Sequence, residues 1–303
     1  MNILFIGYGS IALRHRNIIE NSYDNVKFYA LRHSDTNNKN DDVVLIEKKE
    51  IGSLNFTAIF LTCPSAFHCQ YITELISYGV PIFVEKPVCI NKLQLKTLNK
   101  ISTKSKKLIY TGCNLRFHSL INFTKLFLNK NRSKIFEVSA YAGSYLPEWR
   151  PLKDYKKLYS SKKSLGGGVD LDLMHEPDLL YYLFGKPELS RIKKRKVSSL
   201  KIDSKDWAQI YFEYKNFSAS ITLNYFRKEP KREIEIVMEN DIIVIDFIKG
   251  IVSNTKEILF NAKKDAMQLS YENQIDYFFK SIKKKKFEIN CFEEALDVIS
   301  LIL

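Results

Sequence analysis

The chain has 303 residues, of which 45% are hydrophobic and 27% charged, as in soluble globular proteins of about two domains. Its apolar runs are far shorter than the ~18 residues of a membrane span, and the start MNILFIGYGS lacks the features of a signal peptide, so we expect a cytoplasmic protein without a membrane partner. Five cysteines without CxxC spacing fit neither a disulfide framework nor a zinc ribbon, and we expect no metal.

The formal net charge is +13, and lysine-rich runs occur at residues 191–196 (RIKKRK) and 283–286 (KKKK). One interpretation is a nucleic-acid-binding protein. However, no aromatic residue interleaves either run, and neither lies in a recognisable nucleic-acid module. The pattern therefore favours a solvated surface over nucleic-acid binding, and a positive field of this kind would also attract a phosphorylated ligand.

The first third of the chain alternates short apolar strands with helical segments. Strands are predicted at residues 2–7, 26–32, 43–47, 57–63, 80–87 and 107–114, and helices at 10–21 and 68–79. Strands and helices in alternation indicate right-handed βαβ units and a doubly wound parallel sheet.

The pattern changes in the second part of the chain. In FSASITLNY (217–225) apolar and polar residues alternate with period two, which is typical of a half-solvated antiparallel strand. Further strands are predicted at residues 135–145, 206–214, 232–238 and 241–247, and a helix at 292–303. These segments predict an α+β domain with a large open, mainly antiparallel sheet, and the half-apolar face of that sheet suggests a homo-oligomer.

The domains are predicted to span residues 1–117 and 118–303. The second is interpreted as a substrate and oligomerisation domain. Its last helix is apolar enough to pack back against the first domain.

The first strand runs into GYGSIA (7–12), where Gly7, Gly9 and Ala12 give the pattern GxGxxA. The first glycine permits a tight turn, the second lets backbone N–H groups approach a pyrophosphate, and the small third residue lets helix and strand pack closely. The motif follows a strand and opens a helix, as a dinucleotide site requires. We therefore predict a Rossmann-type cradle formed by Gly7, Gly9, Ser10, Ile11 and Ala12.

The second strand ends without the carboxylate that usually binds the ribose of NAD. It carries Arg32, and Ser34 follows, two residues that suit a 2′-phosphate. The sequence therefore favours NADP(H) over NAD(H), while an exposed loop cation is the alternative interpretation of Arg32.

Several further motifs follow in order along the chain. They are Thr62-Cys63-Pro64 with His68, Glu85-Lys86-Pro87, Asn114-Leu115-Arg116-Phe117-His118, and Gly166-Gly167-Gly168 followed by Asp172, His175 and Asp178. Together with GYGSIA they resemble the Gfo/Idh/MocA family of NAD(P)-dependent oxidoreductases over nearly the whole chain. The resemblance implies cofactor contacts from Thr62, Pro64, His68, Glu85 and Lys86.

Two features distinguish this sequence from the usual family pattern. The third loop residue is Ala12, and His175 follows Asp172 by three residues where many members have four. The DLMHEPD segment and YLPEWRPLKDY (145–155) resemble a branch linked to sugar-nucleotide and surface-polysaccharide pathways. This resemblance suggests substrate contacts, for which the candidates are Arg116, His118, Tyr145, Trp149 and Arg150, with packing as the alternative for each.

The chemistry expected of these residues is hydride transfer at an alcohol or carbonyl carbon. Lys86 leaves the carboxyl end of a parallel strand, where such sheets bind ligands, and its ammonium can stabilise negative charge on the reacting oxygen. His175 is the natural proton acceptor near neutral pH. Asp172, predicted one helical turn earlier, would orient the imidazole or take the proton itself. Pro177 predicts a kink or a helix start at this point.

We therefore expect an NAD(P)-dependent oxidoreductase acting on a sugar or a sugar nucleotide, in surface-glycan biosynthesis. The alternative is a non-catalytic, dinucleotide-sensing regulator on the same fold.

Overall fold

The computed structural model describes residues 1–31, 43–131, 133–284 and 286–303. These residues form two compact units. The first comprises Met1–Cys113 and Tyr271–Ile299, and the second comprises Asn114–Ser270 and Ser300–Leu303. The domain boundary at residues 117 and 118 stays a prediction.

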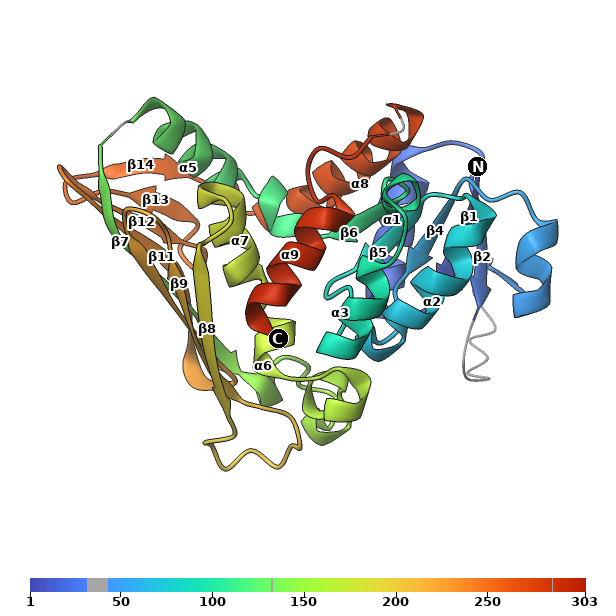
Figure 1. Cartoon of the computed structure of the whole chain (residues 1–303), viewed down its shortest axis with the longest axis horizontal. Helices are drawn as coiled ribbons and strands as arrows, with labels where there is room; N and C mark the ends of the chain where they lie inside the picture. Colours follow the sequence, from blue (N-terminus) through green and yellow to red (C-terminus); the bar gives the residue numbers. More distant parts are fainter. Residues whose placement is uncertain (32–42, 132, 285) are drawn as a thin grey trace. The chain divides into compact units, whose positions relative to one another are not determined.

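The first unit is built on a parallel sheet of six strands in the order β3-β2-β1-β4-β5-β6 (Figure 1). The strands are β1 (Asn2–Ile6), β2 (Lys27–Leu31), β3 (Val44–Leu45), β4 (Ala58–Leu61), β5 (Ile82–Glu85) and β6 (Ile109–Gly112). All the pairs in this sheet are parallel, as predicted from the apolar runs. The strand order reverses between β1 and β4, and at such a switch point the carboxyl ends of the strands leave room for a ligand.

The helices of the first unit include three that the sequence did not suggest. Those expected are α1 (Ser10–Ser22), α2 (His68–Leu75) and α9 (Phe292–Ile302), and those added are α3 (Lys92–Asn99), α4 (Thr103–Lys106) and α8 (Ala266–Lys284). Helix α8, which crosses from the second unit into the first, was missed because its apolar residues are separated by many polar ones.

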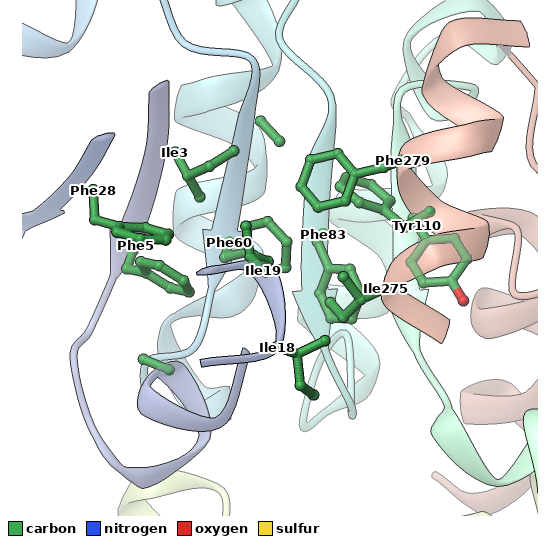
Figure 2. Close-up of a cluster of buried hydrophobic side chains, with 13 residues drawn as sticks. Ile3, Phe5, Ile18, Ile19, Phe28, Phe60, Phe83, Tyr110, Ile275 and Phe279 are labelled. Carbon is green, nitrogen blue, oxygen red and sulfur yellow. The ribbon is translucent and has the colours of Figure 1, made fainter. Parts of the chain in front are cut away.

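Aromatic side chains from α8 complete the core on one face of the parallel sheet (Figure 2). Phe60 of β4 and Phe83 of β5 stack with ring centroids 4.8 Å apart, and the ring of Phe278 packs edge-on to both at 5.5 and 5.3 Å. Ile18 and Ile19 of α1 belong to the same cluster. Burial of aromatic rings in such pairs is among the largest stabilising contributions in a core.

The second unit is built on a sheet of eight strands in the order β14-β13-β12-β11-β7-β10-β9-β8. The strands are β7 (Ile135–Tyr145), β8 (Leu189–Arg195), β9 (Trp207–Glu213), β10 (Ser218–Asn224), β11 (Phe226–Met238), β12 (Ile242–Asp246), β13 (Ile251–Ser253) and β14 (Ile258–Asn261). Among the described strands of this eight-stranded sheet, only β7 and β10 pair in parallel, so the predicted mainly antiparallel sheet is confirmed.

The period-two pattern predicted for β10 agrees with the structure. The basic run 191–196, predicted only as a solvated surface, lies mostly in a strand. Ala219, Ile221 and Leu223 are buried. The basic run forms most of β8, an edge strand whose odd-numbered cations are exposed while Lys194 forms an ion pair with Asp170 at 2.6 Å. Lysines on an edge strand oppose pairing with other strands, which gives this run a structural purpose.

The α-helices α5 (Ser119–Lys130), α6 (Val169–Asp172) and α7 (His175–Phe184) also belong to the described part of the second unit. No helix in the described part of the chain is both long and apolar enough to cross a membrane.

Candidate functional site

The turn between β1 and α1 is packed tightly at its first glycine. Gly7 has a φ of +82°, and a Cβ placed on it would lie 2.7 Å from the Cα atom of Cys63. The Gly7 carbonyl accepts a hydrogen bond from Thr62 Oγ1 at 2.6 Å. Only glycine fits this position, because a side chain would need both a left-handed backbone and room that the β4–α2 loop occupies.

The second glycine of the turn has free space where a side chain would stand, whereas the first has none. A Cβ on Gly9 would have no atom of the described chain within 4 Å. Gly9 is the N-cap residue of α1, and as a glycine it has no side chain with which to cap the helix. An anion bound there would meet the first backbone N–H groups of the helix and its positive dipole end. Ala12 is fully buried, which allows the close packing that the motif requires.

The β4–α2 loop is braced by a buried histidine. His68 places Nδ1 2.7 Å from the Pro87 carbonyl oxygen and Nε2 3.0 Å from the Cys63 carbonyl oxygen. Burial lowers the pKa of His68, although both carbonyls favour its charged form. The imidazole therefore ties the loop that holds Pro64 to the segment that follows Lys86.

The EKP segment ends β5, and its glutamate has a partner that the sequence analysis did not single out. Lys86 is half-buried and precedes Pro87 through a cis peptide bond. Glu85 Oε1 lies 2.6 Å from Nε2 of His15, a fully buried residue of α1. The helical spacing places His15 on the same apolar face as Ala12 and Ile19, which is the signal that could have revealed it.

Arg32 and Ser34, the residues predicted to bind a 2′-phosphate, lie outside the described residues. The preference of the chain for NADP(H) over NAD(H), which was based on these two residues, stays a prediction.

In the second unit the HEPD segment begins a new helix. Helix α6 ends at Asp172, and α7 begins at His175 with Pro177 in its first turn. Asp172 and His175 therefore belong to two helices and not to the single turn expected from the sequence. The missing N–H group of proline is tolerated in a first helical turn, which explains the helix start at this point.

Asp172 accepts a short hydrogen bond from a buried tyrosine. The donor is the Tyr225 hydroxyl at 2.5 Å, and burial, with Asp172 next, raises the pKa of Tyr225 well above its ordinary value. Trp149 packs edge-on against the Tyr225 ring at 5.3 Å and donates from Nε1 to Ser144 Oγ at 2.8 Å. Tyr225 thus links the carboxylate of Asp172 to the indole of Trp149, a residue predicted to bind substrate.

The two acidic residues of the HEPD segment, Glu176 and Asp178, form ion pairs within the second unit. Asp178 accepts from Arg116 Nη2 at 2.7 Å and from Arg116 Nε at 3.0 Å, with both side chains almost fully buried. Glu176 Oε1 lies 2.6 Å from Arg232 Nε. The guanidinium of Arg116 is thus engaged by Asp178 within the fold. The predicted contact between Arg116 and a substrate stays a prediction.

His118 is also engaged within the fold. Its Nδ1 accepts a hydrogen bond from the Leu120 N–H at 3.3 Å and caps α5. Burial, with the positive charge of Arg232, lowers the pKa of His118 to about 4. The imidazole is therefore neutral at neutral pH, as an N-cap acceptor must be.

The remaining substrate candidates lie at the end of β7 and in the segment that follows. Tyr145 is half-buried, and Arg150 is exposed. Arg150 lines a cleft of about 420 Å³ together with Lys153, Asp154, Lys157, Leu158 and Tyr159. Within the described residues, no group of three or more His, Cys, Asp or Glu side chains is arranged to hold a metal ion.

Comparison with known proteins identifies the first unit most directly. Residues 1–113 match the profile of a family described as "Oxidoreductase family, NAD-binding Rossmann fold", the Gfo/Idh/MocA family. No curated protein sequence matches the chain significantly.

Solved structures share the fold over the whole chain at low sequence identity. An oxidoreductase from Thermotoga maritima has a TM-score of 0.84 and 18% identity over 100% of this chain and 94% of its own. The WlbA dehydrogenase from Bordetella pertussis, solved with NADH and UDP-GlcNAcA, has a TM-score of 0.81 and 15% identity over 100% and 94%. The UDP-N-acetylglucosamine 3-dehydrogenase GnnA from Acidithiobacillus ferrooxidans has a TM-score of 0.78 and 16% identity over 99% of this chain and 94% of its own.

Proposed function

Because residues 1–113 match the profile of the Gfo/Idh/MocA family of NAD-binding oxidoreductases, we propose that the chain transfers a hydride between a nicotinamide cofactor and a sugar or sugar nucleotide. The reacting group of the substrate is a hydroxyl or its carbonyl. The observation that carries the proposal is the open position at Gly9, the N-cap residue of α1. A dinucleotide pyrophosphate fits there, because the backbone leaves free the volume that a side chain would fill.

The cofactor would supply the hydride acceptor or donor, and the chain supplies the groups that handle charge and protons. Lys86 holds the reacting oxygen and stabilises negative charge on it. His175 moves the hydroxyl proton. The hydrogen bond from Tyr225 holds the Asp172 carboxylate in place, and in this proposal Asp172 orients or charge-stabilises the imidazole.

The substrate class is supported by the motifs of the second unit and by two of the structural neighbours. The names of those neighbours mention nucleotide sugars. We assign substrate binding to the second unit, with Trp149 and Arg150 as the leading contacts. A homo-oligomer, a preference for NADP(H) through Arg32 and Ser34, and a role in surface-glycan biosynthesis are parts of the same proposal.

The first test is a fluorescence titration of the full chain with NADPH and with NADH at low and moderate salt. We expect one of the two to bind with micromolar affinity or better, and the preferred one decides the role of Arg32 and Ser34. Absence of binding by both would overturn the oxidoreductase proposal.

The chemical assignment is tested by Lys86→Met in turnover assays with a panel of nucleotide sugars. Loss of the ammonium should lower kcat at least ~100-fold, because charge on the reacting oxygen is then unsupported. Cofactor affinity should stay within a few-fold. Lys92→Met, which changes an exposed lysine at the start of α3, is the matched control. Near-normal turnover of Lys86→Met would show that the assignment is wrong.

A further inference from the structure

The segment between β7 and α6 forms a cleft with an unusual concentration of positive charge. The cleft of about 420 Å³ is lined by six residues of residues 150–159: Arg150, Lys153, Asp154, Lys157, Leu158 and Tyr159. The lining therefore contains three cationic side chains and one carboxylate, and we call this feature the basic cleft. Its volume falls within the range of about 300–1,000 Å³ of small-molecule sites.

The one carboxylate of the basic cleft is partly engaged by the backbone. Asp154 Oδ1 accepts a hydrogen bond from the Lys156 N–H at 3.0 Å and thereby caps the short 3₁₀ turn Tyr155–Lys157. No ion pair of Lys153 or Lys157 is found within the described residues. An anion entering the cleft would therefore meet a net positive charge at its lining.

The walls of the basic cleft are fixed by hydrogen bonds. The Tyr159 hydroxyl donates to the Gly166 carbonyl at 3.0 Å, and the Ser204 hydroxyl donates to the Ser160 carbonyl at 2.8 Å. A Cβ on Gly167 would lie 2.4 Å from the Tyr159 carbonyl oxygen, so the glycine lets the two segments touch. A site with a fixed backbone loses less conformational entropy when a ligand binds.

The basic cleft is also connected to the proposed chemical groups of the second unit. The glycines that pack against Tyr159 lead directly into α6, at whose end Asp172 lies, and then into α7, which begins with His175. A ligand held at the cleft would therefore be anchored on the same scaffold that carries these groups. Enzymes use binding at a non-reacting part of the substrate to position the reacting part.

We propose that the basic cleft binds the phosphate or diphosphate group of the substrate, which makes the substrate a phosphorylated or nucleotide-linked sugar and not a free sugar. This inference rests on the proposed function. Arg150 supplies a planar donor set for phosphate oxygens, and Lys153 and Lys157 supply point charges. Leu158 and Tyr159 provide an apolar and aromatic edge for the group that the phosphate carries.

The test is calorimetric titration of the full chain with inorganic pyrophosphate at constant ionic strength. Saturating NADH, or NADPH if it is preferred, is present to occupy the cofactor cradle. We expect pyrophosphate to bind, and Lys153→Gln and Lys157→Gln each to weaken binding about tenfold, because each removes a charge-assisted hydrogen bond. Lys156→Gln is the matched control, since this exposed lysine of the same run does not line the cleft, and it should change affinity less than twofold.

Three outcomes separate this inference from the proposed function. Absence of pyrophosphate binding, or equal weakening by Lys156→Gln, overturns the basic cleft while cofactor binding leaves the oxidoreductase proposal standing. Lysine-dependent pyrophosphate binding without any cofactor binding supports the basic cleft and overturns the oxidoreductase proposal. Repeating the titration with UDP identifies the source of the phosphate, because tighter, lysine-dependent binding of UDP supports a nucleotide-linked sugar.

Discussion

His118 shows how one buried side chain can support the fold and also make its stability depend on pH. It caps α5 as a neutral imidazole, and its pKa is lowered to about 4 by burial and by Arg232. In the unfolded chain the same group has a pKa of about 6.5. The unfolded state therefore binds a proton that the folded state refuses as the pH falls from about 6.5 to about 4. This contribution to stability is complete above pH 6.5 and is lost over that interval.

We predict that His118→Asn removes part of this acid sensitivity. Asparagine keeps a side-chain acceptor for the Leu120 N–H and does not titrate. Between pH 7 and pH 4 the wild-type chain should lose about 2 kcal/mol more of its free energy of unfolding than the variant. Urea unfolding followed by circular dichroism at several pH values measures both, and His68 is common to the two proteins. Parallel stability profiles would contradict the assignment of the titration to His118.

The ion pairs of the HEPD segment show what a sequence can and cannot predict at this scale. The cluster of acidic residues was visible, and the choice of Asp172 and His175 came from spacing and resemblance. The partners were not visible, because Arg116, Arg232 and Tyr225 lie 53 to 62 residues away along the chain, in separate segments. Sequence spacing predicts neighbours on one helix, whereas these contacts depend on tertiary packing.

At the scale of elements, strands with a clear apolar pattern were predictable and amphipathic edges were not. The buried strands β1, β4 and β5 are continuous apolar runs, as strands covered on both faces must be. Strand β8 was missed because its edge position permits alternate lysines and arginines, so that charge obscures the period-two pattern. Helix α8 was missed for a related reason, since its polar residues mask the stripe that buries Phe278 and Phe279.

The turn between β1 and α1 gives a prediction that separates a structural glycine from a ligand-binding glycine. Gly7→Ala should lower the free energy of unfolding by about 2–4 kcal/mol, because the new Cβ needs a left-handed backbone and meets the Cys63 backbone. Gly9→Ala has an extended backbone and open space, so its stability should stay within about 1 kcal/mol of the wild type.

Gly9→Ala, the variant that should keep its stability, should nevertheless lose cofactor affinity per folded molecule. Gly9→Ala fills the space proposed for the pyrophosphate and should weaken NAD(P)H at least ~10-fold. Thermal unfolding and NAD(P)H fluorescence on the same samples measure the two effects. Unchanged cofactor affinity in a folded Gly9→Ala protein would show that the cradle is not at this turn.

At the scale of the whole molecule, the first unit is not a continuous stretch of chain. It needs Tyr271–Ile299 as well as Met1–Cys113. The Thr111 N–H donates to the Asn290 carbonyl at 3.0 Å, and Asn290 Nδ2 donates to the Tyr110 hydroxyl at 3.0 Å and to the Cys113 carbonyl at 3.1 Å. A predicted domain of residues 1–117 ends before these partners, and the packing of the last helix against the first domain stays a prediction.

We predict that a fragment of residues 1–117 does not fold stably alone. It lacks Ile275, Phe278 and Phe279, and removal of a single buried phenylalanine side chain costs about 3–5 kcal/mol, against a total domain stability of about 5–15 kcal/mol. The rings of Phe60, Phe83 and Tyr110 would then be exposed to water.

The matched control joins residues 1–113 to 271–299 through a flexible glycine–serine linker of about 20 residues, which restores the missing face of the core. Urea unfolding followed by circular dichroism, with dye binding to exposed apolar surface, compares the two proteins. The joined protein should unfold cooperatively, and the short fragment should bind dye without a cooperative transition. A cooperative transition of similar midpoint in both proteins would show that α8 adds nothing to the first unit, and that residues 1–117 form a domain by themselves.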